Sequence, residues 1–261
     1  MRRRDFIKAV AGAASAWPLV VRAQPAIPII GYLSLTSPDE RRTLLAAFHQ
    51  GLKETGFVAG QNVKIEFRSA DGKIERLPAL AAELAKVPVT VIASTGGEVV
   101  ARAAKAASSR IPIVFTSSSD AVKSGLVASL NRPGGNVTGV SLLGYELDAK
   151  RLQLLRELLP KASTIGVLVN ADNPAMAATL PEMKVAANAN GQRLVVLNAR
   201  SAADIDAAFV SLRSNGVDAL LVTTNPFYEG RRDHIVTLAR SHSVPVLYPW
   251  REYASDGGLI S

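Results

Sequence analysis

The chain of 261 residues lacks cysteine altogether. It can therefore form no disulfide, use no thiolate, and carry no lipid on a cysteine at the end of an N-terminal signal. Its hydrophobic content of 48% is enough to bury a substantial core, so the fold does not depend on disulfides. No apolar run reaches the roughly eighteen residues that a membrane-spanning helix needs. The sequence thus indicates one or two globular domains.

Aromatic residues are scarce, at 5% of the chain, and the net charge of +8 is unevenly distributed. The first 23 residues account for +4 of it, because five basic residues there accompany only one acid, Asp5. In the remainder, basic residues are scattered among acidic ones and form no stripe suited to a phosphate backbone. The few aromatic side chains cannot supply a surface on which bases stack. We therefore expect no nucleic-acid partner.

Motifs of known catalytic chemistry are also missing. The three histidines, His49, His234 and His242, have no metal-ligand spacing. The sequence contains neither HExxH nor GxSxG, and Ser94-Thr95-Gly96-Gly97 is no phosphate loop because GKS or GKT is absent. The charged runs Glu40-Arg41-Arg42 and Arg231-Arg232-Asp233 are predicted to be exposed helix faces. We expect no metal, no cofactor and no enzymatic activity.

The first 23 residues are predicted to be an export signal. Basic residues Arg2 to Arg4 precede a modestly apolar segment from Ala9 to Val21, and Val21-Arg22-Ala23 has small or β-branched residues where a signal peptidase needs them. Arg3-Arg4-Asp5-Phe6-Ile7-Lys8 resembles the twin-arginine signal that routes folded proteins across the bacterial inner membrane. An ordinary Sec signal or a basic amphipathic helix is the alternative. We expect a periplasmic protein without a lipid anchor.

Apolar runs and amphipathic helical patterns alternate along the chain. This repeated order predicts parallel sheets covered by helices on both faces. Strands are predicted at residues 27–34, 63–68, 89–93, 113–115 and 137–140, and then at 164–169, 193–197, 219–222 and 246–248. Helices are predicted from the Ser37 cap to near Gly56, and then at 74–86, 98–108, 121–130, 149–159, 174–190, 202–215 and 230–241. Residues 24–141 are predicted to form one α/β lobe and residues 142–261 a second, with the hinge just before Leu142.

Hydroxyl and amide side chains follow the ends of the predicted strands. Ligands bind outside the carboxyl ends of parallel strands, and helix N-termini there favour a carboxylate. Ser, Thr and Asn also cap helices whether or not anything binds, so capping is the alternative for each of them. Gly96 and Gly97 permit close backbone approach to a ligand. The candidate ligand-binding residues are Ser34, Thr36, Ser94, Thr95, Gly96, Thr116, Ser117, Ser118, Asn170, Asn173, Thr224, Asn225 and Trp250.

Five other assignments leave alternatives open. Asp120 caps its helix or pairs with a ligand ammonium group. Tyr228, Tyr248 and Trp250 wall an apolar pocket or pack in the core, and Tyr32 is similar.

Four segments carry a family resemblance: GLKETGFVAGQNVKIEFRSADG, IPIVFTSSSDAVKSGLV, LNRPGGNVTGVS and LLRELLPKASTIGVLVN. They resemble the substrate-binding proteins of ABC uptake systems related to the tryptophan- and tyrosine-binding TrpX proteins. The resemblance covers about residues 27–261. It implies the type I periplasmic-binding-protein fold, with a small ligand in the cleft between two lobes and an ABC permease of the inner membrane as partner. The implied ligand is an amino acid, such as an aromatic one, or a related carboxylate.

The resemblance also bears on the last residues and on rival functions. Asp256 to Ser261 looks like a turn followed by half a strand, which in the family crosses back to the first lobe before a closing helix and strand. We therefore expect a C-terminally truncated chain that is a monomer or a weak dimer. The alternatives are a periplasmic sensor that feeds a signalling partner and an enzyme on the same fold. A repressor of this fold would need a helix-turn-helix where the export signal stands.

Overall fold

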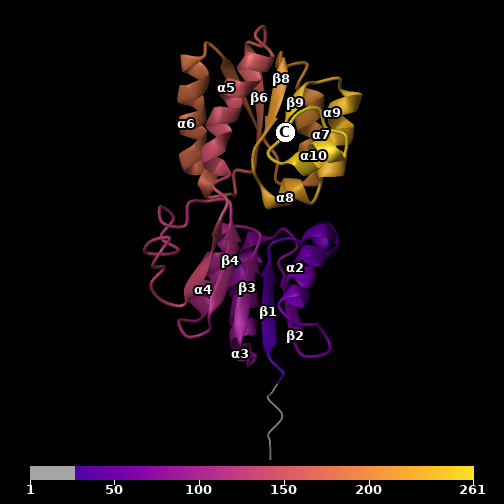
Figure 1. The fold of residues 1–261 in the computed structure, drawn as a ribbon. Helices are drawn as coiled ribbons and strands as arrows, with labels where there is room; N and C mark the ends of the chain where they lie inside the picture. Colours follow the sequence, from indigo (N-terminus) through magenta and orange to yellow (C-terminus); the bar gives the residue numbers. More distant parts are fainter. Residues whose placement is uncertain (1–26) are drawn as a thin grey trace, which may run out of the picture.

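The computed structural model describes residues 27–261, so the expected export signal lies outside the described residues. The described residues form two α/β lobes, stacked one above the other in Figure 1. The first lobe has a five-stranded sheet of order β2-β1-β3-β4-β5, and the second has a four-stranded sheet of order β7-β6-β8-β9. Every strand pair is parallel. The α/β class with parallel sheets that the sequence predicts is confirmed.

The first lobe buries its core on one face of its sheet. Helices α3 and α4 pack Leu84 and Val100 against Ile92, Ile113 and Phe115 of the sheet, and all five side chains are buried. The strands are β1 (Ile29–Ser34), β2 (Lys64–Ser69), β3 (Val91–Thr95), β4 (Ile113–Ser117) and β5 (Val137–Ser141). The helices are η1 (Asp39–Arg41), α2 (Arg42–Glu54), η2 (Ile74–Arg76), α3 (Leu77–Lys86) and α4 (Glu98–Ala107).

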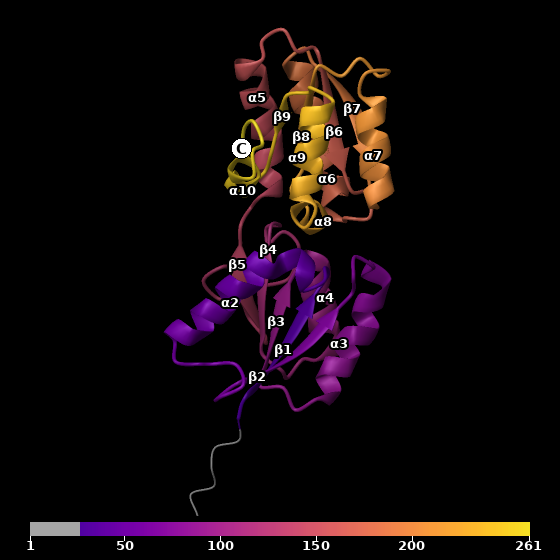
Figure 2. The ribbon, with the colours of Figure 1, turned by 90° about the vertical axis from the view of Figure 1, so that its right-hand side faces the viewer.

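Among residues 27–261, only α2 lies on the opposite face of this sheet, on the other side from α3 and α4 in Figure 2. Phe48 of α2 packs on Tyr32 of β1, but no residue of α2 is fully buried. Farther along the same face, Val114 of β4 is 46% exposed and Val140 of β5 is 54% exposed. The expectation of a sheet covered on both faces is therefore wrong for β4 and β5 within residues 27–261.

The helix predicted at residues 121–130 is also wrong, because this segment forms turns. The Asp120 carboxylate accepts the N–H groups of Val122 and Lys123, but Gly125 then adopts φ 71°, which ends the first helical turn. The carbonyl groups that a continuing helix would have used accept hydrogen bonds from another donor. Lys105 of α4 donates to the carbonyls of Gly125 and Leu126 at 3.0 and 2.9 Å. A cation of a neighbouring helix thus replaces the helical hydrogen bonds here.

The second lobe is covered on both faces of its sheet. Helices α5 and α6 pack on Val167 and its neighbours, and α7 and α9 pack on the opposite face around Leu168. The strands are β6 (Thr164–Val169), β7 (Arg193–Asn198), β8 (Ala219–Val222) and β9 (Val246–Leu247). The helices are α5 (Asp148–Leu158), α6 (Ala175–Ala189), α7 (Ala202–Ser211), α8 (Pro226–Glu229), α9 (Arg232–Ser241) and α10 (Arg251–Ser255). The short helices α8 and α10 are not predicted from the sequence.

Two further features position the site. The chain passes from β5 to α5 through the linker, residues 142–147, which includes the 3₁₀ turn η3 (Tyr145–Leu147). At the end of the chain, Ile260 forms a parallel bridge with Leu247, and its carbonyl accepts the Tyr248 N–H at 2.9 Å. Within residues 27–261, no helix has the length and hydropathy to cross a bilayer.

Candidate functional site

A cavity of about 360 Å³ lies between the two lobes, and both lobes supply its lining. Its volume falls in the range of about 300–1,000 Å³ that is usual for small-molecule sites. It is lined mostly by apolar surface, and two basic and two acidic residues are among its lining. The lining residues are Arg41, Thr43, Leu44, Gly96, Gly97, Thr116, Ser117, Ser118, Leu142, Pro226, Glu229, Arg232, Trp250, Glu252 and Tyr253.

Two much smaller cavities adjoin this one. A cavity of about 10 Å³ shares Arg41 with it, and one of about 20 Å³ shares Gly96, Gly97 and Pro226. The predicted ligand-binding residues divide among the three. The large cavity takes Gly96, Thr116, Ser117, Ser118 and Trp250, the 10 Å³ cavity takes Ser34 and Thr36, and the 20 Å³ cavity takes Gly96, Asn170, Asn173 and Asn225. Ser94, Thr95 and Thr224 line none of these three cavities.

Buried hydroxyl groups without partners gather at the ends of β1 and β3. The Oγ1 atoms of Thr36 and Thr95 and the Oγ of Ser94 have no hydrogen-bond partner among the described residues. Ser34 lies opposite Thr95 in the parallel register, and its hydroxyl donates to the Thr36 carbonyl at 2.8 Å. Most buried polar groups in proteins are paired, so this corner holds unused hydrogen-bonding capacity. Such capacity suits a polar ligand group or a bound water.

The Gly96-Gly97 pair shapes the start of α4. Gly96 has φ 105°, and a Cβ there would lie 2.9 Å from both the Cβ and the N of Leu35. Gly97, at φ 99°, is the N-cap of α4 and supplies no side chain to cap it. The first N–H groups of α4 are therefore not capped by a side chain at a wall of the large cavity.

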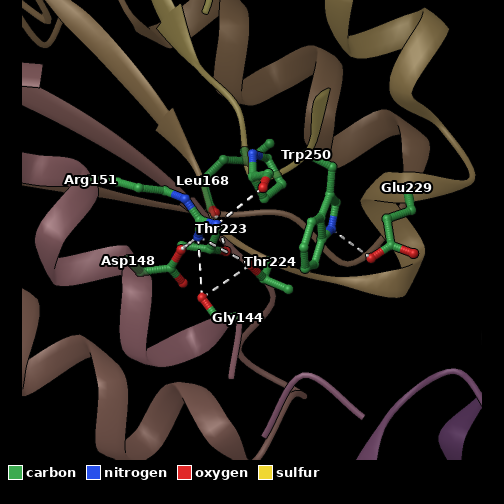
Figure 3. A network of polar contacts seen from close by, with 9 residues as sticks. Gly144, Asp148, Arg151, Leu168, Thr223, Thr224, Glu229 and Trp250 are labelled. Carbon is green, nitrogen blue, oxygen red and sulfur yellow. Dashed lines mark hydrogen bonds and ion pairs between the residues drawn. The ribbon is translucent and has the colours of Figure 1, made fainter. Parts of the chain in front are cut away.

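Two ion pairs join the lobes beside the cavity. Arg41 Nη2 lies 2.9 Å from Glu229 Oε2, and Arg231 Nη2 lies 2.8 Å from Glu40 Oε1. The indole N–H of Trp250 donates to the other Glu229 oxygen at 3.0 Å (Figure 3). The expectation that 40–42 and 231–233 are exposed helix faces is thus wrong for Glu40, Arg41 and Arg231. These three side chains are partly buried because they contact the other lobe.

A second polar network surrounds Arg151 of α5 (Figure 3). Its Nη1 donates to Asp148 Oδ1 at 2.6 Å, to the Gly144 carbonyl at 3.2 Å and to Thr224 Oγ1 at 3.3 Å. Its Nη2 donates to the Pro249 carbonyl at 3.0 Å. Asp148 is fully buried, and burial raises the pKa of its carboxyl to about 7 against the opposing effect of Arg151. No sequence motif points to this network.

The residues with open alternatives mostly have packing or capping roles. Asp120 caps its turn through Val122 and Lys123 and does not line the large cavity. Tyr228 is buried and donates to the Ala199 carbonyl at 2.9 Å, and Tyr248 stacks on Tyr253 with ring centroids 4.8 Å apart. Tyr32 is buried against α2 and lines the 10 Å³ cavity. Trp250 alone of these five lines the large cavity.

Tyr253 is a cavity residue that the sequence does not predict. It lies on the unpredicted helix α10, and its hydroxyl is buried without a partner among the described residues. Burial raises the pKa of this hydroxyl well above its ordinary value. Among residues 27–261, no group of three or more His, Asp or Glu side chains is placed to hold a metal ion.

Comparisons with known proteins show what the chain is similar to. A family model described as ABC transporter substrate binding protein matches residues 29–261. A tyrosine-binding protein of Clostridioides difficile is 29% identical over 214 residues, which cover 81% of this chain and 60% of that protein. The chain thus matches less than two thirds of this relative's length.

Two solved structures share the fold. A conserved domain protein from Vibrio cholerae has a TM-score of 0.77 at 24% identity, covering 89% of this chain and 77% of that one. The ABC domain of a Streptococcus pneumoniae protein in complex with L-Trp has a TM-score of 0.71 at 23% identity, covering 88% and 77%. The architecture is that of the type I periplasmic binding proteins.

Proposed function

The chain belongs to the family of ABC transporter substrate-binding proteins, and on that basis we propose that it binds an amino acid between its lobes for delivery to a permease. The observation that carries the proposal is the 360 Å³ cavity lined from both lobes. The family consists of binding proteins rather than enzymes. Its members work outside the cytoplasm, in the periplasm or the extracellular space.

The walls of the cavity favour a zwitterion with an apolar side chain. Leu44, Leu142 and Trp250 supply apolar surface, and Glu229 offers a carboxylate to a ligand ammonium group. The start of α4 at Gly97 and the hydroxyls at the end of β4 favour a ligand carboxylate. The tyrosine-binding relative supports an aromatic amino acid as the ligand. Trp250 is then the ring on which the ligand side chain stacks.

We also propose lobe closure as the signal to the transporter. We propose residues 24–141 and 142–261 as the two lobes, residues 24–26 lying outside the described residues. The linker between the lobes bends as the ligand draws them together. We further propose that the twin-arginine signal at Arg3 and Arg4 directs export of the protein to the periplasm. A soluble periplasmic protein with no lipid anchor would then diffuse between ligand and permease.

Calorimetry on the purified protein tests the ligand class. L-Tyrosine, L-tryptophan, L-phenylalanine and L-leucine would be titrated, together with tyramine and 4-hydroxyphenylpropionate, which each lack one charge of the amino acid. We expect the aromatic amino acids to bind and both analogues to bind more weakly, because each leaves a charged or polar wall unpaired. Saturation at 100 times the Kd should raise the free energy of unfolding by about 2.7 kcal/mol.

A control substitution outside the cavity should leave the ligand affinity unchanged. Val185→Ala changes a side chain on α6 that is 70% exposed and does not line the cavity, so its affinity should equal that of the wild type. If none of the amino acids binds, or if tyramine binds as tightly as tyrosine, the proposed ligand class is wrong.

A further inference from the structure

The guanidinium group of Arg151 connects three segments that are distant in the sequence. It donates to Gly144 in the linker, to Thr224 after β8 and to Pro249 after β9. Figure 3 shows Arg151 with dashed contacts to Asp148, Gly144 and Thr224. A planar guanidinium with several donors can bridge acceptors in this way, whereas a lysine ammonium acts as a single point charge.

The linker end of this connection is tightly packed between the lobes. A Cβ at Gly144 would lie 3.1 Å from Thr224 Cγ2 and 3.2 Å from Ser118 Cβ. The Thr224 hydroxyl donates to the Gly144 carbonyl at 3.4 Å, and the Tyr145 N–H donates to the Ser118 carbonyl at 3.4 Å. The linker therefore has little freedom to move without disturbing both strand ends and the Arg151 contacts.

The other end of the connection reaches the cavity wall. Pro249, whose carbonyl accepts from Arg151, directly precedes Trp250. The indole of Trp250 lines the cavity and is held by Glu229, which in turn pairs with Arg41 of the first lobe. Trp250 is thus fixed on both sides, through its backbone neighbour and through its ring nitrogen.

The buried carboxylate of Asp148 keeps Arg151 in place. Asp148 is fully buried one helical turn before Arg151, and Arg151 Nη1 donates to Asp148 Oδ1 at 2.6 Å. A simple ion pair that stabilised α5 would need only this contact. The additional bonds to Gly144, Thr224 and Pro249 all go to segments outside α5.

We propose that Arg151 is a positioning residue that couples the placement of Trp250 in the cavity to the orientation of the linker between the lobes. The coupling rests on the proposed function only in taking this cavity as the ligand site. When the lobes turn about the linker, Gly144 shifts relative to Arg151, and the bond to Pro249 transmits the shift to the cavity wall. Ligand packed on Trp250 would act on the linker by the same path, because coupling is reciprocal.

The test compares Arg151→Lys with Lys150→Gln, an exposed change on the same helix. Lysine keeps a positive charge beside Asp148 but cannot bridge the same acceptors. A Trp17→Phe background leaves Trp250 as the only tryptophan, so acrylamide quenching reports its placement. Because the chain has no cysteine, Lys53→Cys and Lys184→Cys provide a spin-label pair across the lobes. Both measurements are made on the ligand-free protein.

We expect Arg151→Lys to raise the quenching of Trp250 and to broaden the distance distribution between the lobes, while Lys150→Gln changes neither. Ligand affinity should fall about ten-fold in the lysine variant. If Arg151→Lys only lowers the unfolding midpoint, or changes one of the two ligand-free measurements without the other, the proposed coupling is wrong. Failure of the wild type to bind any amino acid would overturn the proposed function and leave the ligand-free result valid.

A second variant tests the same coupling in case Arg151→Lys does not fold. Asp148→Asn combined with Arg151→Gln removes both charges together, so no buried charge is left uncompensated. This double variant also loses the guanidinium bridge and should show the same two ligand-free changes. Wild-type quenching and distances in a folded double variant would contradict the proposal.

Discussion

Arg41 and Glu229 form an ion pair between the lobes, with Nη2 and Oε2 2.9 Å apart. Their side chains are 10% and 20% exposed, so solvent screens the pair less than it screens a typical surface pair. Glu40 and Arg231, their neighbours in sequence, pair in the opposite sense at 2.8 Å. Each lobe therefore contributes one acid and one base, and the two pairs together favour the relative orientation of the lobes seen in this structure.

Reversing one charge of the second pair should open the cleft. Arg231→Glu places two carboxylates together at the lobe boundary, so we expect longer distances between spin labels on the two lobes. Adding Glu40→Arg restores opposite charges and should restore the distances. The control is Arg42→Glu, whose partner Asp39 and own side chain are 88% and 81% exposed, so reversal there should change nothing. Unchanged distances in Arg231→Glu would show that these pairs do not hold the lobes.

Two substitutions of Trp250 distinguish what its ring contributes to ligand affinity from what its hydrogen bond contributes. Trp250→Phe keeps an aromatic wall but loses the N–H that holds Glu229, so affinity for an aromatic amino acid should fall by about 1 kcal/mol. Trp250→Ala also removes the stacking surface and should cost more than the phenylalanine variant. Calorimetry on both variants measures the difference. Equal affinities of the alanine variant and the wild type would remove Trp250 from the site.

Gly96 should not tolerate a side chain. Gly96→Ala puts a Cβ 2.9 Å from the Leu35 backbone at φ 105°, so we expect a loss of about 1–3 kcal/mol in the free energy of unfolding. Gly51→Ala is the matched control, because Gly51 lies within α2 and a Cβ added there would meet no other atom within 4 Å. That change should stabilise the protein by about 0.5–1 kcal/mol. Urea unfolding compares the two, and a neutral Gly96→Ala would contradict the strained geometry.

The export signal can be tested on the precursor. Changing Arg3 and Arg4 together to Lys should leave unprocessed protein in the cytoplasm if the twin-arginine route is used. Cell fractionation and the size of the product report the outcome. Normal delivery of this double variant to the periplasm would indicate the Sec route instead.

The sequence predicts the strands well because a parallel strand buried between helices is a short, nearly continuous apolar run. The prediction for 219–222 matches β8, Ala219–Val222, and the helix predicted from residue 202 begins there as α7, behind a capping box of Ser201 and Asp204. Local signals fail where distant groups decide the backbone. The turns after Asp120 depend on Lys105 of α4, which no local pattern reveals.

The candidate site also contains some residues that local sequence predicts and others that it does not. Gly96 directly follows β3 and Ser117 is the last residue of β4, so their place at the cavity can be predicted from strand order alone. Arg41 meets Glu229 across 188 residues, and Arg151 meets Pro249 across 98. Each of these arginines looks locally like part of a charged helix face. Only the folded arrangement of the lobes identifies their partners.

The pKa of Asp148 gives the last prediction. Burial raises this pKa to about 7, from a value near 4 in an unfolded chain, although Arg151 and a Thr224 N–H oppose the rise. Between these two values the folded protein retains a proton that the unfolded chain has released. The contribution to stability is therefore complete below about pH 4 and is lost as the pH rises through about 7.

The free energy of unfolding should consequently fall by up to about 1.4 kcal/mol per pH unit between pH 4 and pH 7 because of this one group. Asp148→Asn keeps an acceptor for Arg151 but cannot titrate, so the variant should lose that slope.

Asp218→Asn is the contrasting control. Hydrogen bonds from the Thr164 and Ser163 N–H groups hold the pKa of Asp218 below its ordinary value, so its effect lies below pH 4. Urea unfolding from pH 4 to pH 8 measures all three proteins, and equal slopes for the wild type and Asp148→Asn would show that Asp148 is ionised throughout, held so by Arg151.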